Sequence, residues 1–199
     1  MSPDPGAPVY SHARWKNEVY MNGYSERIGV QVNSPVIWRR IVFWSYYKNP
    51  SAIGPRKGGS SSASAAYYTR QMTPIENDQN LRHVVFKGTQ GIDFDKQTII
   101  MAPVNRDNCD VVMDKTQTLN PIGGGMPRIQ HRKHYFKGGR VIYDGDEAGS
   151  VVLNSEWSTI GRRSKGNMYI LDIFGDGGFS SDRTTKGQFL TEGRLYWTE

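Results

Sequence analysis

The chain has 199 residues, 37% of them hydrophobic, so it is long enough for one well-packed core and too short for more than two small ones. Its 25 Lys and Arg against 19 Asp and Glu give a formal net charge of +6, which favours an anionic partner such as nucleic acid or a membrane surface, although many basic proteins bind nothing specific. A single cysteine, Cys109, excludes an intrachain disulfide. No apolar run of about 18 residues is present, so no segment is expected to span a membrane, and of the two kinds of anionic partner we expect nucleic acid and no membrane.

The first part of the chain contains a lead-in and two β-type runs. Residues 1–15 hold three Pro and one Gly and no apolar core, which predicts an extended lead-in rather than a signal peptide. Ile28, Val30 and Val32 then alternate with smaller or polar residues, a pattern typical of a strand with one buried face. The next run, 36–47, is apolar at successive positions, so we expect a central strand that is covered on both faces.

A loop and a short helix follow these two runs. Residues 48–66 are rich in Gly, Ser and Pro, a composition that predicts a flexible surface loop without core residues. Thr73 as N-cap, Pro74 at the first helical position and Glu76 together form a capping box. We therefore expect a short helix that ends near Leu81.

The rest of the chain alternates strand-like runs with turn clusters. The runs cover 83–87, 98–101, 110–118, 129–136, 140–143, 168–174 and 189–197. The turn clusters lie at 88–91, 120–125, 144–149 and 176–182. About eight or nine short strands with one capped helical turn predict an all-β sandwich or barrel.

Basic residues gather in stretches that lack acidic ones. No Asp or Glu occurs from 28 to 75 or from 119 to 143, and a third cluster lies in the loop IGRRSKGN. Guanidinium and ammonium groups bind the phosphates of single-stranded nucleic acid, and aromatic rings beside them stack on its bases. Each stretch alone is equally consistent with a solvated basic loop. The predicted contacts are Arg39, Arg40, Lys48, Arg132, Lys133, Arg162 and Arg163, with Tyr46 and Tyr135 for stacking and Trp38 or Tyr47 as further candidates.

The sequence offers little for catalysis or metal binding. His131 and His134 are three residues apart and would share a face only on a helix, with no further ligand close in sequence. The run at 144–149 begins like a calcium loop but lacks oxygen ligands where that loop requires them. Cys109 precedes an apolar strand and is interpreted as a small buried residue. We therefore expect no catalytic site, no metal and no cofactor, and a protein that is not an enzyme.

Seven blocks of the sequence resemble, in the same order, the capsid proteins of genomoviruses, which are small circular single-stranded DNA viruses. The blocks are VYMNGYSERI, SPVIWRRIVF, HVVFKGTQGIDF, VVMDKTQTL, HYFKGGRVIYDGDEAG, NMYILDIF and RLYWTE. The resemblance implies that residues 16–199 form a jelly-roll capsid domain. It also implies a homo-oligomeric T=1 icosahedral shell around single-stranded DNA, present in the virion and in the host cell nucleus.

One region departs from the resemblance. Capsid proteins of this family open with a long basic arm that serves DNA packaging and binding to host nuclear import factors, and the first jelly-roll strand follows it. In this chain MSPDPGAPVYSHAR stands in that place with a single arginine, so the arm and the first strand are expected to be missing. A sandwich without that strand would expose an unpaired sheet edge. The alternative hypothesis is a β-sandwich module that binds single-stranded nucleic acid without assembling.

Overall fold

The computed structural model describes residues 16–48, 56–58, 67–69, 78–95, 98–121, 127–148, 151–176 and 187–199. The predicted lead-in at 1–15 lies outside these residues. The strands are β1 (Glu18–Val32), β2 (Val36–Ser45), β3 (Arg56–Gly58), β4 (Tyr67–Thr69), β5 (Asp110–Leu119), β6 (Arg128–Ala148), β7 (Val151–Ser158), β8 (Asn167–Asp176) and β9 (Gly187–Thr198). The helical segments are α1 (Gln79–Val85) and the short 3-10 helix η1 (Ile99–Met101). No described helix has the length and apolarity needed to cross a membrane.

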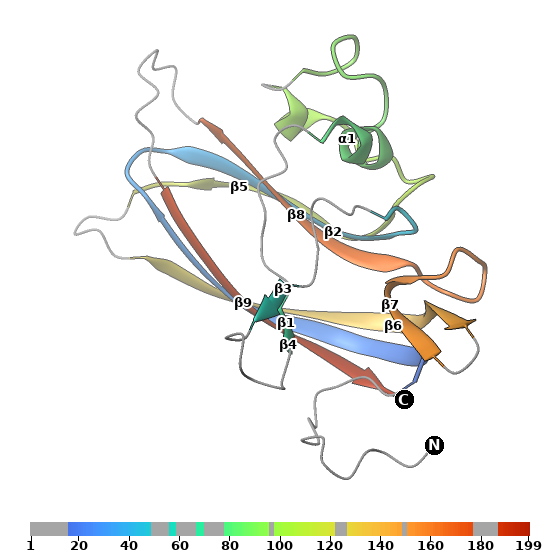
Figure 1. Ribbon diagram of the computed structural model, residues 1–199. Helices are drawn as coiled ribbons and strands as arrows, with labels where there is room; N and C mark the ends of the chain where they lie inside the picture. Colours follow the sequence, from blue (N-terminus) through green and yellow to red (C-terminus); the bar gives the residue numbers. More distant parts are fainter. Residues whose placement is uncertain are drawn as a thin grey trace.

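Two antiparallel sheets face each other, as Figure 1 shows. One sheet has the strand order β7-β6-β1-β9 and the other has the order β5-β2-β8. The consecutive strands β1 and β2 lie in opposite sheets, and the pairs β5–β6 and β8–β9 flank them on either side in the same way. This wrapping of strand pairs is the arrangement of a jelly roll, so the predicted all-β, jelly-roll-like sandwich is confirmed.

The alternation in β1 places one face of the strand in the sandwich core. Ile28 and Val30 are buried and pack against Val36 and Trp38 of β2. Val19, near the start of β1, and Trp44, near the end of β2, belong to a second core cluster. The inward face of β1 was therefore predicted correctly from the two-residue period of its apolar side chains.

β2 is central and is covered on both faces, as its composition predicts. One face contributes Trp38 and Trp44 to the sandwich interior. The other face contributes Ile41 and Phe43 to a cluster that contains Leu81 and other residues of the α1 region. In Figure 1, α1 lies on the side of the β5-β2-β8 sheet that faces away from the other sheet.

The helix extends further along the chain than the sequence predicted. Asp78 is its N-cap and accepts a hydrogen bond from the backbone N–H of Leu81 over 2.9 Å. The predicted start at 73–76 lies outside the described residues. The predicted end near Leu81 is wrong because the helix continues to Val85, and the strand predicted at 83–87 is therefore wrong as well. Leu81 and Val85, four residues apart, share the buried face of the helix, and so short an apolar run does not distinguish helix from strand.

Three further predictions are corrected by the structure. The strand expected at 98–101 is instead η1. The runs at 129–136 and 140–143 join into the single strand β6, which continues through much of the expected turn at 144–149.

At Gly139 an added Cβ would lie 2.3 Å from the Met21 carbonyl oxygen, so glycine permits the close approach of β6 to β1 beside the register shift.

Two short features were not predicted. β7 pairs with the end of β6. Within the segment expected as a loop at 48–66 lies β3, which pairs with β4 just after that segment. Most of the other residues of 48–66 lie outside the described part of the chain.

Candidate nucleic-acid interface

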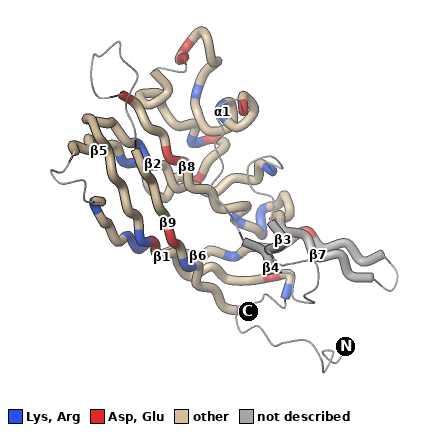
Figure 2. The backbone as a smooth tube through the Cα atoms, turned by 60° about the vertical axis from the view of Figure 1, so that its left-hand side comes forward, with Lys and Arg blue, Asp and Glu red and all other residues tan. Residues whose placement is uncertain are grey.

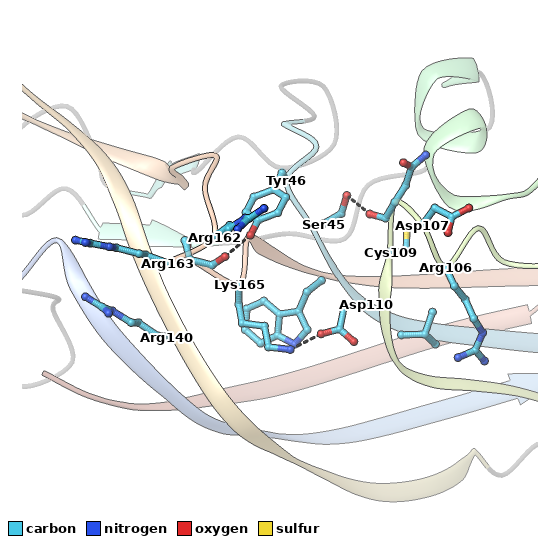
Figure 3. A pocket seen from close by; sticks show the side chains of 14 residues that line it. Ser45, Tyr46, Arg106, Asp107, Cys109, Asp110, Arg140, Arg162, Arg163 and Lys165 are labelled. Atoms are coloured by element: carbon cyan, nitrogen blue, oxygen red, sulfur yellow. Dashed lines mark hydrogen bonds and ion pairs between the residues drawn. The ribbon is translucent and has the colours of Figure 1, made fainter.

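An open pocket of about 660 Å³ lies at one end of the sandwich. It is bordered by the end of β2, by residues 106–111 and by the loop at 161–165. Five basic side chains line it: Arg106, Arg140, Arg162, Arg163 and Lys165. In Figure 3, Arg106 lies apart from the other four, across the pocket. This group of lining residues is called the basic pocket below.

The loop at 161–165 is held in place by hydrogen bonds to its surroundings. The Tyr46 hydroxyl donates to the carbonyl oxygen of Gly161 over 2.9 Å and also contacts that of Ser164. The Ser164 hydroxyl accepts from the Ile142 N–H over 3.0 Å. Gly166 ends the loop with φ at +92°, where an added Cβ would lie 2.8 Å from the Ser45 carbonyl oxygen. The exposed Arg162 and Arg163 therefore stand on a fixed loop.

Two of the five cations already have carboxylate partners. Lys165 forms an ion pair with Asp110. The Nη2 of Arg140 donates a hydrogen bond to the Oε2 of Glu18 over 2.8 Å. The hydrogen bond from Arg140 lowers the pKa of the Glu18 carboxyl, and the positive charge of Arg163 lowers it further. Glu18 therefore remains ionised at neutral pH.

The other three cations, Arg106, Arg162 and Arg163, are the ones in this pocket that can bind an anion without giving up a carboxylate partner among the described residues. Within the part of the chain that the structure describes, the side chains of Arg106, Arg162 and Arg163 form no ion pair. Guanidinium groups bind phosphate oxygens through paired hydrogen bonds. The basic pocket can therefore bind the phosphate backbone of a nucleic acid without reading its bases.

Cys109 also lines the basic pocket but is buried, as the sequence predicted. Burial raises the pKa of its thiol to about 11, and the thiol donates to the Val84 carbonyl oxygen over 3.6 Å. The sulfur is therefore protonated at neutral pH and is a poor nucleophile.

Arg39 and Arg40 lie in the protein interior, on opposite faces of β2 as expected. Arg39 forms two hydrogen bonds to the Asp114 carboxylate, over 2.9 and 2.7 Å, and a third to the Ile100 carbonyl oxygen over 3.0 Å. Arg40 pairs with Glu26 and, over 3.2 Å, with Asp172. Their exposed fractions are 6% and 2%. The predicted nucleic-acid contacts of this arginine pair are therefore corrected, because carboxylates of the fold already occupy both guanidinium groups.

Four other candidates are occupied by contacts within the protein. Lys48 pairs with Asp144 over 2.9 Å. The Arg132 guanidinium lies 5.1 Å from the centre of the Trp38 ring, and burial lowers its pKa. Trp38 is fully buried, so its predicted stacking on nucleic acid is corrected as well. Tyr47 is partly buried and packs against the cluster between β2 and the α1 region.

The remaining predicted residues fall into two separate places. Tyr46, Arg162 and Arg163 come together in the basic pocket. Lys133 and Tyr135 lie on the outer face of the four-stranded sheet, where Tyr135 is 81% exposed. The Lys and Arg positions of the chain are spread over both sheets rather than gathered on one element (Figure 2).

The two histidines considered as metal ligands are separated by the strand that carries them. His131 is exposed on the outer face of β6, whereas His134 points inward and lies 3.4 Å from Glu26. Residues three apart on a strand point to opposite faces, so the two rings cannot share a metal.

Arg106 was not singled out from the sequence, and Arg140 was noticed only as one cation of the acid-free stretch at 119–143. Arg106 stands next to Asp107 in a segment without a basic run, so its neighbours give no signal. Only the folded chain places it on the same pocket as Arg162 and Arg163.

The chain matches no protein-family model, no curated protein and no solved structure in the corresponding comparisons.

Proposed function

We propose that this protein is a capsid subunit that assembles into a small icosahedral shell around single-stranded DNA, in the virion and in the host cell nucleus. One observation carries the proposal: seven blocks of the sequence resemble, in the same order, those of genomovirus capsid proteins, and the chain folds as the jelly-roll-like sandwich that this resemblance implies. The sandwich alone would not support it, because many unrelated functions use this architecture.

The edge strands of both sheets support self-association. Among the described strands, β5, β8, β7 and β9 each have a partner on one side only. Edge strands present unpaired backbone N–H and C=O groups that a second chain can pair with. Identical subunits that repeat one such contact form a closed assembly when the rotation that relates neighbouring subunits brings the last subunit back to the first.

The basic pocket supports the contact with DNA. A capsid must enclose its genome whatever the local base sequence, and phosphate contacts are independent of sequence. The guanidinium groups of Arg106, Arg162 and Arg163, which form no ion pair among the described residues, suit such contacts.

Assembly is tested on the purified chain, with and without circular single-stranded DNA, by electron microscopy and by sizing with light scattering. We expect closed particles of one size. A chain that stays monomeric at every salt and protein concentration would contradict the shell. If that monomer binds single-stranded DNA with a steep salt dependence, the alternative of a non-assembling binding module, which the basic pocket also supports, would replace it.

Removing the two loop cations is expected to weaken binding to DNA by weakening phosphate contacts. For the Arg162→Ala/Arg163→Ala double variant, the slope of log affinity against log salt should fall by roughly 1.4, the value for two lost phosphate contacts on a single strand. Fluorescence anisotropy with a labelled single-stranded oligonucleotide measures this slope. The control is Lys87→Ala/Lys115→Ala, which removes the same charge from exposed positions outside the pocket. Equal slopes for the two double variants would show that the pocket does not hold phosphate.

A further inference from the structure

The outer face of the β6-β1-β9 part of the larger sheet is open to solvent. Tyr135 is 81% exposed, Ile129 58%, Leu190 57% and Tyr196 51%. The Ser25 and Tyr196 hydroxyl oxygens lie 3.1 Å apart, which places their side chains on the same face. Four cross-strand rows make up what we call the sheet platform: Tyr135–Gly23–Tyr196, Lys133–Ser25–Arg194, His131–Arg27–Glu192 and Ile129–Gly29–Leu190.

The middle of the platform is kept low by small residues of β1. Gly23 lies between the two tyrosines, so β1 places no side chain in the space between their rings. At Gly29 an added Cβ would meet only the Leu190 Cβ, at the ordinary contact distance of 3.7 Å. Packing within the chain therefore does not require glycine at this position, and its effect is to leave the face flat.

Cations lie between the aromatic row and the apolar row. Lys133, Arg27 and Arg194 project from three neighbouring strands, and Glu192 is the one acidic side chain of the four rows. Glu192 lies 3.7 Å from Arg194, and both are exposed. Arg27 and Lys133 form no ion pair with a described residue.

We propose that the sheet platform binds single-stranded nucleic acid, with bases stacked on Tyr135 and Tyr196 and phosphates held by Lys133, Arg27 and Arg194. Every base has a face that stacks on an aromatic ring, and the cations beside the rings hold the backbone without regard to sequence. This inference rests on the proposed function for its ligand, and it adds a stacking surface to the phosphate contacts of the basic pocket.

The charges favour nucleic acid over a second protein surface as the occupant. Lysine and glutamate are depleted at protein–protein interfaces, whereas arginine and tyrosine are enriched there, so the lysine and the glutamate are the residues that discriminate. The two middle rows of the platform hold both of them, Lys133 and Glu192, beside Arg27 and Arg194. A polyanion that carries flat bases complements both the excess of cations and the exposed rings.

The experiment compares two labelled oligomers of equal length, an oligothymidylate and an abasic phosphodiester, by anisotropy titration against the full chain. For Tyr135→Ala and for Tyr196→Ala we expect affinity for the oligothymidylate to fall roughly 5- to 140-fold, since a stacked base contributes about 1–3 kcal/mol. Affinity for the abasic oligomer should stay unchanged, and Tyr135→Phe should bind like the parent chain. Ile92→Ala, which changes an exposed apolar residue outside the platform, is the matched control.

Each other outcome is decisive. Tyrosine variants that bind both oligomers like the parent chain would overturn the stacking platform and leave the proposed function standing. Variants that bind normally but no longer assemble would also overturn it, because the face would then be a contact between copies of the chain. If the parent chain binds neither oligomer, the DNA contact of the proposed function fails together with this inference.

Discussion

The Arg40→Met variant is expected to lose about 3–5 kcal/mol of unfolding free energy at neutral pH, because one partner of a buried ion pair is removed. The Arg40 guanidinium lies between Glu26, whose side chain is fully buried, and Asp172, whose side chain is 10% exposed. Methionine fills a similar volume but leaves both carboxylates in the interior without their counter-charge. Denaturation by urea, followed by circular dichroism, measures the loss.

The loss should depend on pH in a defined direction. Burial already raises the pKa of Asp172, and the charge of Arg40 opposes that rise, so the variant raises it further. When the pKa of a carboxyl is higher in the folded state than in the unfolded state, ionisation of that carboxyl destabilises the fold, and the full effect is present above the folded-state pKa. Below the unfolded-state pKa the carboxyl is protonated in both states, so the effect is absent. The stability difference between parent and variant should therefore shrink as the pH falls through the carboxylate range.

Lys115→Met provides the control for this position. Lys115 pairs in register with Arg40 on the neighbouring strand but is exposed, so its loss should change stability by less than about 0.5 kcal/mol. If Arg40→Met is as stable as this control, Arg40 does not hold the two carboxylates in the interior. A triple variant with Glu26→Gln and Asp172→Asn should recover part of the loss, since it removes the uncompensated charges.

The Phe43→Ala variant is expected to destabilise the protein by about 3–5 kcal/mol, the usual cost of removing a buried phenyl ring and leaving a cavity. Phe43 is 1% exposed, and its ring stacks on Tyr169 with 5.5 Å between the ring centres. It belongs to the cluster that joins β2 to the α1 region. Hydrogen exchange should therefore show that amides of α1 lose protection along with the sheet.

Two comparison variants make this result specific. Phe43→Leu keeps most of the apolar volume and should cost clearly less than Phe43→Ala. Tyr135→Ala removes an aromatic ring of similar size from a side chain that is 81% exposed, and it should leave stability nearly unchanged. Equal midpoints for Phe43→Ala and Tyr135→Ala would mean that the helix layer contributes little to the fold.

The regular strands could be predicted because their signal is local. Alternate side chains of a strand point to opposite faces, so the spacing of Ile28 and Val30 identifies the buried face of β1 before any partner strand is known. The apolar residues on both faces of β2 likewise indicate that both of its faces are covered. The end of the helix at 79–85 is predicted wrongly because its buried residues are few, and only packing against Phe43 and its neighbours distinguishes a helix from a strand there.

The candidate site was predicted less well, because charge in a sequence does not say where a side chain lies. Arg162 and Arg163 were found because they stand in an exposed loop, where neighbouring residues are enough to recognise a solvated cation. Arg39 and Arg40 have equally basic surroundings in sequence. Their partners Asp114 and Asp172 lie on other strands of the sheet, 75 and 132 residues further along the chain.

Composition and a two-residue period are therefore enough to predict the all-β class, the central position of β2 and the excess of cations. Which of those cations are available to a partner depends on how the chain folds. Strand register brings Asp172 opposite Arg40 and gathers Arg106, Arg140 and Arg162 around one pocket. Such register depends on pairing between segments far apart in the chain, and a local pattern of residues does not contain it.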